Sequence, residues 1–117
     1  MCWLNEPEDH DYDAASQYLS LFDDPKWGAI QGAVDRLRGA VTVQYFAKDI
    51  MRASQLALLP EDNAHVAKDI AKVKRGKFLS PVLLIRGNPL VVADGYHRVC
   101  AAYHIDENAP VSCRIAN

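Results

Sequence analysis

The chain lacks several features that mark whole classes of proteins. Its 117 residues contain only three cysteines and no Cys-x-x-Cys pair, which argues against a disulfide framework and a thiolate zinc site. Apolar runs such as residues 82–85 are far shorter than the roughly 18 residues of a spanning helix. The N-terminus lacks the basic and apolar stretches of a signal peptide. We therefore expect a cytoplasmic protein that does not enter a membrane, with reduced thiols of which at least two pack as apolar groups.

An excess of basic residues is also absent, since the net charge is −2, and this disfavours a general nucleic-acid binder. The charge is unevenly distributed. Residues 1–24, the acidic head, hold seven acidic residues and no Lys or Arg, whereas residues 25–117 hold all 13 basic residues. The head could lie on the basic body, or it could be a solvated helix start in which Asp11 or Asp13 faces the positive end of a helix. His10 lies between two aspartates, but no second His follows at ligand spacing, so we expect no metal site.

Hydrophobic periodicity predicts helices and strands in mixed order. The expected helices span residues 12–22, residues 25–39 after an Asp24-Pro25 cap, residues 47–54, the segment from the cap at 60–63 to Gly76, and residues 96–104. The expected strands span residues 41–45, 82–86, 90–93 and 111–115, with the second and third forming a tight hairpin or a near-neighbour strand pair. This order predicts a small α+β domain with a single core.

Residues 91–98 place a buried strand, a glycine turn and the first turn of a helix in direct succession. The first N–H groups of a helix have no intrahelical partner and lie at the positive end of its dipole, so they suit phosphate oxygens. Gly95 would let the backbone approach an anion closely. His97 and Arg98 would add a titratable donor and a bidentate guanidinium. The segment therefore predicts an anion site.

This segment, together with residues 79–85, resembles the ParB/sulfiredoxin superfamily. Gly95, Arg98 and Ala101 match the family's G-x-x-R-x-x-A box, which contacts nucleotide triphosphates. The resemblance implies a ParB/sulfiredoxin-like mixed sheet with packed helices over residues 41–117, preceded by an acidic helical extension over residues 1–40.

The same resemblance implies a ligand and its contacts. A nucleotide such as ATP, ADP or CTP, with Mg²⁺, would be bound by the box residues together with Tyr96 and His97.

Three branches of the superfamily suggest different activities. Sulfiredoxins have a nucleophilic Cys where this chain has Tyr96, which argues against sulfinic acid reduction. Chromosome-partition proteins continue into a helix-turn-helix, whereas this sequence closes with a strand, so we do not expect sequence-specific DNA binding. Free serine kinases read Asp-Gly-His-x-Arg with a Glu before the preceding helix. Asp94 and the box match them, His97 is displaced by one position, and Glu61 occupies a similar place. This analogy implies phosphoryl transfer with Glu61, Asp94 and His97 as catalytic residues.

Each candidate also has a purely structural interpretation. Asp94 could simply cap the helix that follows, and His97 could be an edge histidine. Arg98 could pair with the acidic head, Glu61 could favour the start of a helix, and Tyr96 could pack on the sheet instead of stacking on a base. A dense basic group is expected to be a solvated helix face, with phosphate binding as the alternative. It comprises Lys68, Lys72, Lys74, Arg75 and Lys77.

Two functions follow from these observations. The first is a small nucleotide- or phosphate-binding protein, with phosphotransferase activity as an option. The second is a non-catalytic interaction or regulatory module, in which the acidic head with Trp3 and Trp27 binds a protein partner or a second copy of the chain.

Overall fold

The computed structural model describes residues 1–22 and 29–117, and it confirms the predicted α+β class. The helices are α1 (Asp9–Leu19), α2 (Ile30–Gly39), α3 (Ala47–Ser54), α4 (Ala64–Lys74) and α5 (Tyr96–Ile105). The strands are β1 (Val43–Phe46), β2 (Val82–Ile85), β3 (Val91–Asp94) and β4 (Pro110–Ala116). Their positions match the predicted elements closely after residue 40, whereas α1 begins earlier than predicted. The expected Asp24-Pro25 cap lies outside the described residues.

The strands form one mixed sheet in the order β1-β4-β2-β3. The predicted hairpin is confirmed, because β2 and β3 pair antiparallel with Leu84 opposite Val92. β4 returns beside β2 in parallel, and β1 pairs antiparallel with the outer side of β4. β3 therefore forms one edge of the sheet, and α5 follows it directly.

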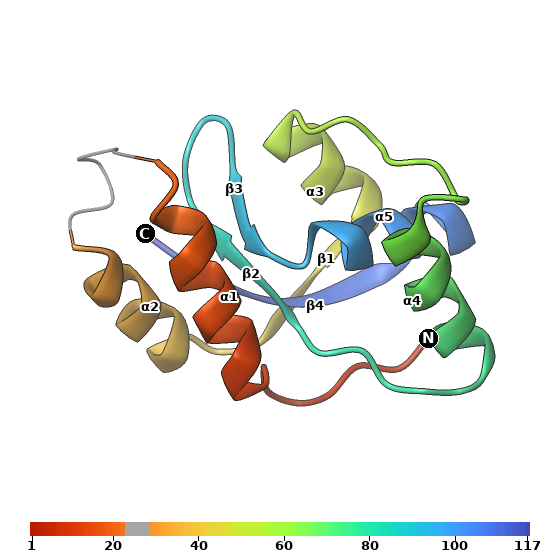
Figure 1. Ribbon diagram of the computed structural model, residues 1–117, viewed down its shortest axis with the longest axis horizontal. Coiled ribbons are helices and arrows are strands. Elements are labelled where there is room, and N and C mark those ends of the chain that lie inside the picture. The colour runs from red at the N-terminus through yellow and green to blue at the C-terminus, as the bar shows by residue number, and fades with distance from the viewer. Residues whose placement is uncertain (23–28) are drawn as a thin grey trace.

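Helices cover both faces of the sheet (Figure 1). The central strand β2 shows why this is needed: all four of its residues are buried, and successive side chains point to opposite faces. Val82 and Leu84 belong to the core formed with α3, α4 and α5. Leu83 and Ile85 belong to a second core formed with α1 and α2, so the expectation of a single core is wrong: the sheet has one core on each face.

The helices α1 and α2 thus form one layer of the fold. Leu19 of α1 and Leu37 of α2 are fully buried against the second face of the sheet. Trp3 is tied to the body as well, since its indole N–H donates to the Pro110 carbonyl at 3.2 Å. Trp27 lies outside the described residues. The suggestion that this part of the chain binds a partner stays a prediction.

The helix α4 carries the predicted cap. The Asn63 side chain accepts hydrogen bonds from the backbone N–H groups of His65 and Val66, at 3.0 and 3.2 Å. Gly76, at φ +74°, follows the helix. Val66 is fully buried in the first core, and α4 packs along α5. This packing brings α4 alongside the segment in which the sequence predicts an anion site.

Two further expectations concern the thiols and the membrane. Cys100 and Cys113 are buried and Cys2 is exposed, which confirms that at least two cysteines pack as apolar groups. Among residues 1–22 and 29–117, no helix combines the length and the apolar character that crossing a bilayer would require.

Candidate functional site

The turn between β3 and α5 is fixed by packing. Asp94 ends β3 and Gly95 is the N-cap of α5, so the interpretation of Asp94 as the helix cap is wrong. Gly95 has φ +104°, and a Cβ added there would lie 2.8 Å from the Val82 Cβ and 2.9 Å from an Arg98 terminal nitrogen. The side of Gly95 that a side chain would occupy is therefore filled by protein atoms. The glycine is required by its backbone conformation and by the close strand, not by the approach of an anion.

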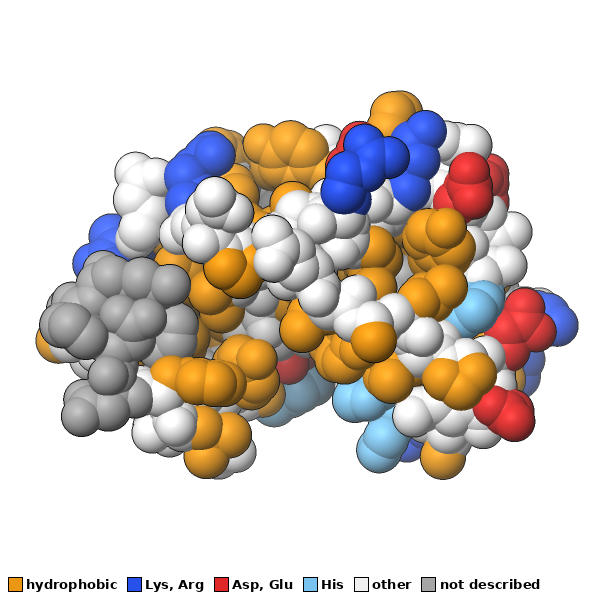
Figure 2. All heavy atoms as spheres, turned by 90° about the horizontal axis from the view of Figure 1, so that it is seen from above, with side chains coloured by type: hydrophobic (Ala, Val, Ile, Leu, Met, Phe, Trp, Pro, Cys, Tyr) orange, Lys and Arg blue, Asp and Glu red, His pale blue; other side chains and the backbone are white. Residues whose placement is uncertain are grey.

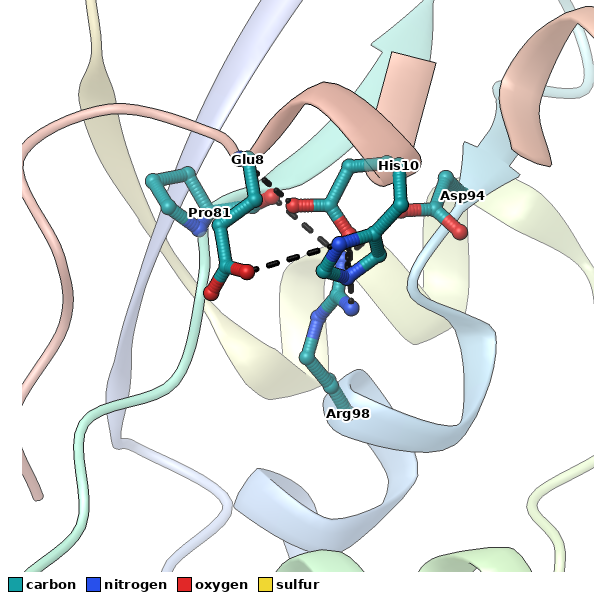
Figure 3. A network of polar contacts seen from close by, with 6 residues as sticks. Glu8, His10, Pro81, Asp94 and Arg98 are labelled. Atoms are coloured by element: carbon teal, nitrogen blue, oxygen red, sulfur yellow. Dashed lines mark hydrogen bonds and ion pairs between the residues drawn. The ribbon is translucent and has the colours of Figure 1, made fainter. Parts of the chain in front are cut away.

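Arg98 points from α5 toward the start of α1, where it is held between two carboxylates (Figure 3). One terminal nitrogen donates to Asp94 at 2.9 Å, and the other lies 3.3 Å from Asp11, whose side chain is only 2% exposed. The structure thus shows the alternative interpretation of Arg98, in which it pairs with the acidic head. Asp11 does not only favour a helix start: it joins α1 to the turn that begins α5.

The two carboxyl groups respond differently to this environment. Burial raises the pKa of Asp94 to about 6, and the nearby Asp11 adds to this effect, while the Arg98 charge opposes it. Burial also acts to raise the pKa of Asp11, but the Arg98 charge and a backbone hydrogen bond from Glu8 outweigh it and lower the pKa of Asp11 overall. Asp94 is thus the group near the turn that can gain or lose a proton close to neutral pH, as a general base must.

A cavity of about 180 Å³, here the cationic cavity, opens beside this turn. From β3 and α5 it is lined by Asp94, Gly95, His97 and Arg98, which confirms that four of the predicted site residues lie together. The rest of its wall comes from α4.

The residues that α4 contributes are His65, Lys68, Asp69 and Lys72. For Lys68 and Lys72 the sequence predicted phosphate binding only as the alternative to a solvated face, and His65 and Asp69 were not predicted as site residues. Their spacing of three, four and seven residues places all four on one helix face. Three cationic side chains and two carboxylates line the cavity, but Arg98 is already paired with two carboxylates, so Lys68 and Lys72 are the cations left to attract an anion. The basic residues beyond this face, such as Lys74 and Lys77, do not line it.

His97 meets His65 across the cationic cavity, with ring centroids 4.7 Å apart. Burial lowers the pKa of His97, and the neighbouring His65 and Arg98 lower it further, while Asp69 acts in the opposite direction. His97 is therefore neutral at physiological pH unless an anion is present, and its protonation is coupled to whatever occupies the cavity. In the space-filling view, histidine side chains lie along one margin of the molecule beside an indentation (Figure 2).

The backbone of α5 supplies further donors at the same place. The first hydrogen bond of the helix runs from the Val99 N–H to the Gly95 carbonyl at 3.0 Å, so the N–H groups of Tyr96, His97 and Arg98 precede it. Gly95 has no side chain to cap them. The start of α5 thus presents its dipole and free donors close to the lysines of α4.

Three of the predicted site residues lie elsewhere. Ala101 is fully buried in the core, where its small side chain faces the sheet and not the cationic cavity. Tyr96 donates its hydroxyl hydrogen to the Ala57 carbonyl and lines a neighbouring cavity. Glu61 lies 3.7 Å from His104, seven residues and about 10 Å along α5 from His97 at a rise of roughly 1.5 Å per residue. The structure therefore does not bring Glu61 into the same cavity as Asp94 and His97.

The acidic cluster at the start of α1 is occupied by protein contacts. His10 lies 3.4 Å from Glu8 and 3.6 Å from Asp11, and the Glu8 backbone N–H donates to Asp11 at 2.9 Å. In the part of the chain that the structure describes, no group of three or more His, Cys, Asp or Glu side chains is arranged to hold a metal ion.

Comparison of the chain with protein-family models, with curated proteins and with solved structures found no match. The resemblance to the ParB/sulfiredoxin superfamily therefore stays a prediction.

Proposed function

We propose that the protein binds a nucleotide or another phosphorylated small molecule, with the phosphate group in the cationic cavity. The observation that supports this proposal is the convergence of Lys68 and Lys72 from α4 on the start of α5. Within the described residues, neither ammonium group has a hydrogen-bond or ion-pair partner, so both are free to pair with phosphate oxygens. Arg98, in contrast, is already engaged by Asp11 and Asp94. The lysines, and not the arginine of the family box, carry the proposal.

The histidines give the proposed binding a pH dependence. A phosphate in the cavity would favour the protonated form of His97 and so oppose the effects that lower its pKa in the free protein. Binding should then take up a proton, and affinity should rise as the pH falls from 8 toward 6. Protonation of Asp94, whose pKa is about 6, would remove a negative charge from the same cavity and act in the same direction.

Titration calorimetry with ATP, ADP and CTP, each with and without Mg²⁺, tests the proposal. The variant Lys68→Gln/Lys72→Gln should bind at least about tenfold more weakly than the parent, because a hydrogen bond to a charged group contributes about 1.5–3 kcal/mol. The variant Lys74→Gln/Lys77→Gln removes the same charge from residues outside the cavity and should retain the parent affinity.

Two results would overturn the proposal. One is no binding of any of the three nucleotides at millimolar concentration by the folded parent. The other is equal weakening in both double variants, which would show a general charge effect and not a site.

A further inference from the structure

A second cavity, of about 410 Å³, adjoins the cationic cavity. The two share Asp94, Gly95 and His97, so they meet at the turn between β3 and α5. The rest of the second cavity is lined by uncharged side chains, and we call it the apolar cavity. These residues are Ala14, Tyr18, Leu56, Val92, Ala93 and Tyr96.

The sizes of the two cavities assign them different parts of a ligand. Pockets for small organic molecules typically measure roughly 300–1,000 Å³. At about 180 Å³ the cationic cavity is too small to enclose a whole organic phosphate, whereas the apolar cavity at about 410 Å³ lies within this range. A phosphate ester bound by the lysines would therefore extend its organic part into the apolar cavity.

Two aromatic residues, which come from different elements, line the apolar cavity. Tyr18 projects from α1 and packs edge-to-face on Phe22, with ring centroids 5.1 Å apart. Tyr96 starts α5, and its ring is fixed by the hydrogen bond of its hydroxyl to the Ala57 carbonyl. Both tyrosines are half-buried, so each can cover part of a flat ring while keeping its own hydroxyl hydrated or bonded.

The sheet edge adds polar backbone groups to this apolar wall. Val92 and Ala93 of β3 line the cavity, and β3 is an edge strand of the sheet. The outer side of an edge strand presents backbone N–H and C=O groups that no neighbouring strand pairs. A ring with hydrogen-bonding atoms on its edge can use such groups, whereas an acyclic polyol would leave the aromatic faces unused.

We infer that the ligand is a phosphate ester with an aromatic or heteroaromatic ring, and that the ring lies in the apolar cavity against Tyr18. The inference rests on the proposed function, because it places the phosphate in the cationic cavity. It assigns Tyr18 of α1 to the ligand site, so the N-terminal layer takes part in recognition. The observation that carries it is that an apolar and a cationic cavity share three lining residues, Asp94, Gly95 and His97.

Calorimetric titration of the full chain with two simple phosphate monoesters tests this inference. The probes are 1-naphthyl phosphate and glycerol 3-phosphate, which share the anionic group and differ in the organic part. The parent should bind the naphthyl ester at least about tenfold more tightly, since a well-placed aromatic contact and the burial of its surface contribute more than 1 kcal/mol.

Variants at two tyrosines locate the ring. Tyr18→Ala should lower the affinity for the naphthyl ester to near that for the glycerol ester, without changing the latter, while Tyr18→Phe should behave as the parent. Tyr45→Ala, at an exposed tyrosine on β1 outside the apolar cavity, should change neither affinity. Thermal melts of each variant establish that it is folded.

The outcomes separate this inference from the proposed function. Equal affinities of the parent for the two esters, both weakened by Lys68→Gln/Lys72→Gln, would overturn the inference and leave the proposed function standing. A preference for the naphthyl ester that survives in folded Tyr18→Ala would overturn the placement of the ring. No binding of either ester or of any nucleotide would remove both proposals.

Discussion

Replacing Asp94 by Asn should make the protein more stable at neutral pH, although it removes one partner of a salt bridge. Asp94 is 16% exposed and shares Arg98 with Asp11. With one guanidinium and two carboxylates, the cluster holds one negative charge too many when both acids are ionised. An Asn at position 94 keeps a carbonyl oxygen that can accept from Arg98, while Asp11 alone balances the charge.

The magnitude and sign follow from the pKa of Asp94, which rises from an ordinary 3.8 to about 6 on folding. The folded state then binds the proton more tightly than the unfolded state, so stability falls as the pH rises between these two values. At 1.36 kcal/mol for each pKa unit, the loss is about 3 kcal/mol. The pKa of Asp11 is lowered on folding, so its effect on stability is the opposite: Asp11 stabilises the fold above pH 3.8, and this contribution is lost as the pH falls below 3.8. The Asn variant should therefore gain about 3 kcal/mol relative to the parent between about pH 4 and pH 7.

Urea unfolding followed by circular dichroism, at one-unit steps from pH 4 to pH 8, measures this difference. The free energy of unfolding of Asp94→Asn minus that of the parent should rise with pH and level off above the pKa of about 6. Asp13→Asn removes an exposed carboxylate from α1 and serves as the control, with a small and constant difference. A flat profile for Asp94→Asn, or one that falls with pH, would refute the reasoning.

Further changes test the packing around the same turn and the state of the thiols. Gly95→Ala should lower the free energy of unfolding in urea by at least about 2 kcal/mol, because Gly95 has a φ of +104° and a strand packs against it. Gly39→Ala is the control and should lower it little, since a Cβ at Gly39 would meet nothing within 4 Å. Equal losses in the two variants would contradict this account. Arg98→Met should lower the free energy of unfolding by about 3–5 kcal/mol, since it leaves a buried carboxylate without its partner. A melting temperature close to that of the parent would argue against the ion pairs of Arg98. With a thiol reagent, only the exposed Cys2 should react in the native protein. The other two thiols are buried, and burial raises the pKa of Cys113 to about 11. Fast reaction of all three thiols before unfolding would contradict this burial.

Local patterns in the sequence predicted most of the secondary structure. The helix at residues 47–54, the Asn63 cap and the hairpin of β2 and β3 are all found as expected. Each depends on groups only a few residues apart: a periodic apolar face, a side chain that reaches the next turn of backbone, or two strands joined by a short connection. Such features depend on residues that are close together in the chain, and for that reason they can be predicted from the sequence alone.

The position of the proposed anion site was also predicted from local sequence, but the residues that line it were not. Gly95, His97 and Arg98 follow one another in sequence, so their proximity to the start of α5 needed no tertiary information. Lys68 and Lys72 join them only because Val66 and its neighbours pack α4 along α5. The sequence pattern of a charged helix face is the same whether that face lies against solvent or lines a cavity.

Only the tertiary structure decided the roles of Arg98 and of the helices α1 and α2. Asp11, the partner of Arg98, is 87 residues away in sequence. Whether Arg98 binds a phosphate ligand or a carboxylate of the protein depends on which acidic residue the packing places within 4 Å of it. The apolar residues of α1 and α2 predict that some surface will cover them, but not which one. The second face of β2 is buried, and the packing of Leu19 and Leu37 against it made α1 and α2 a layer of the fold.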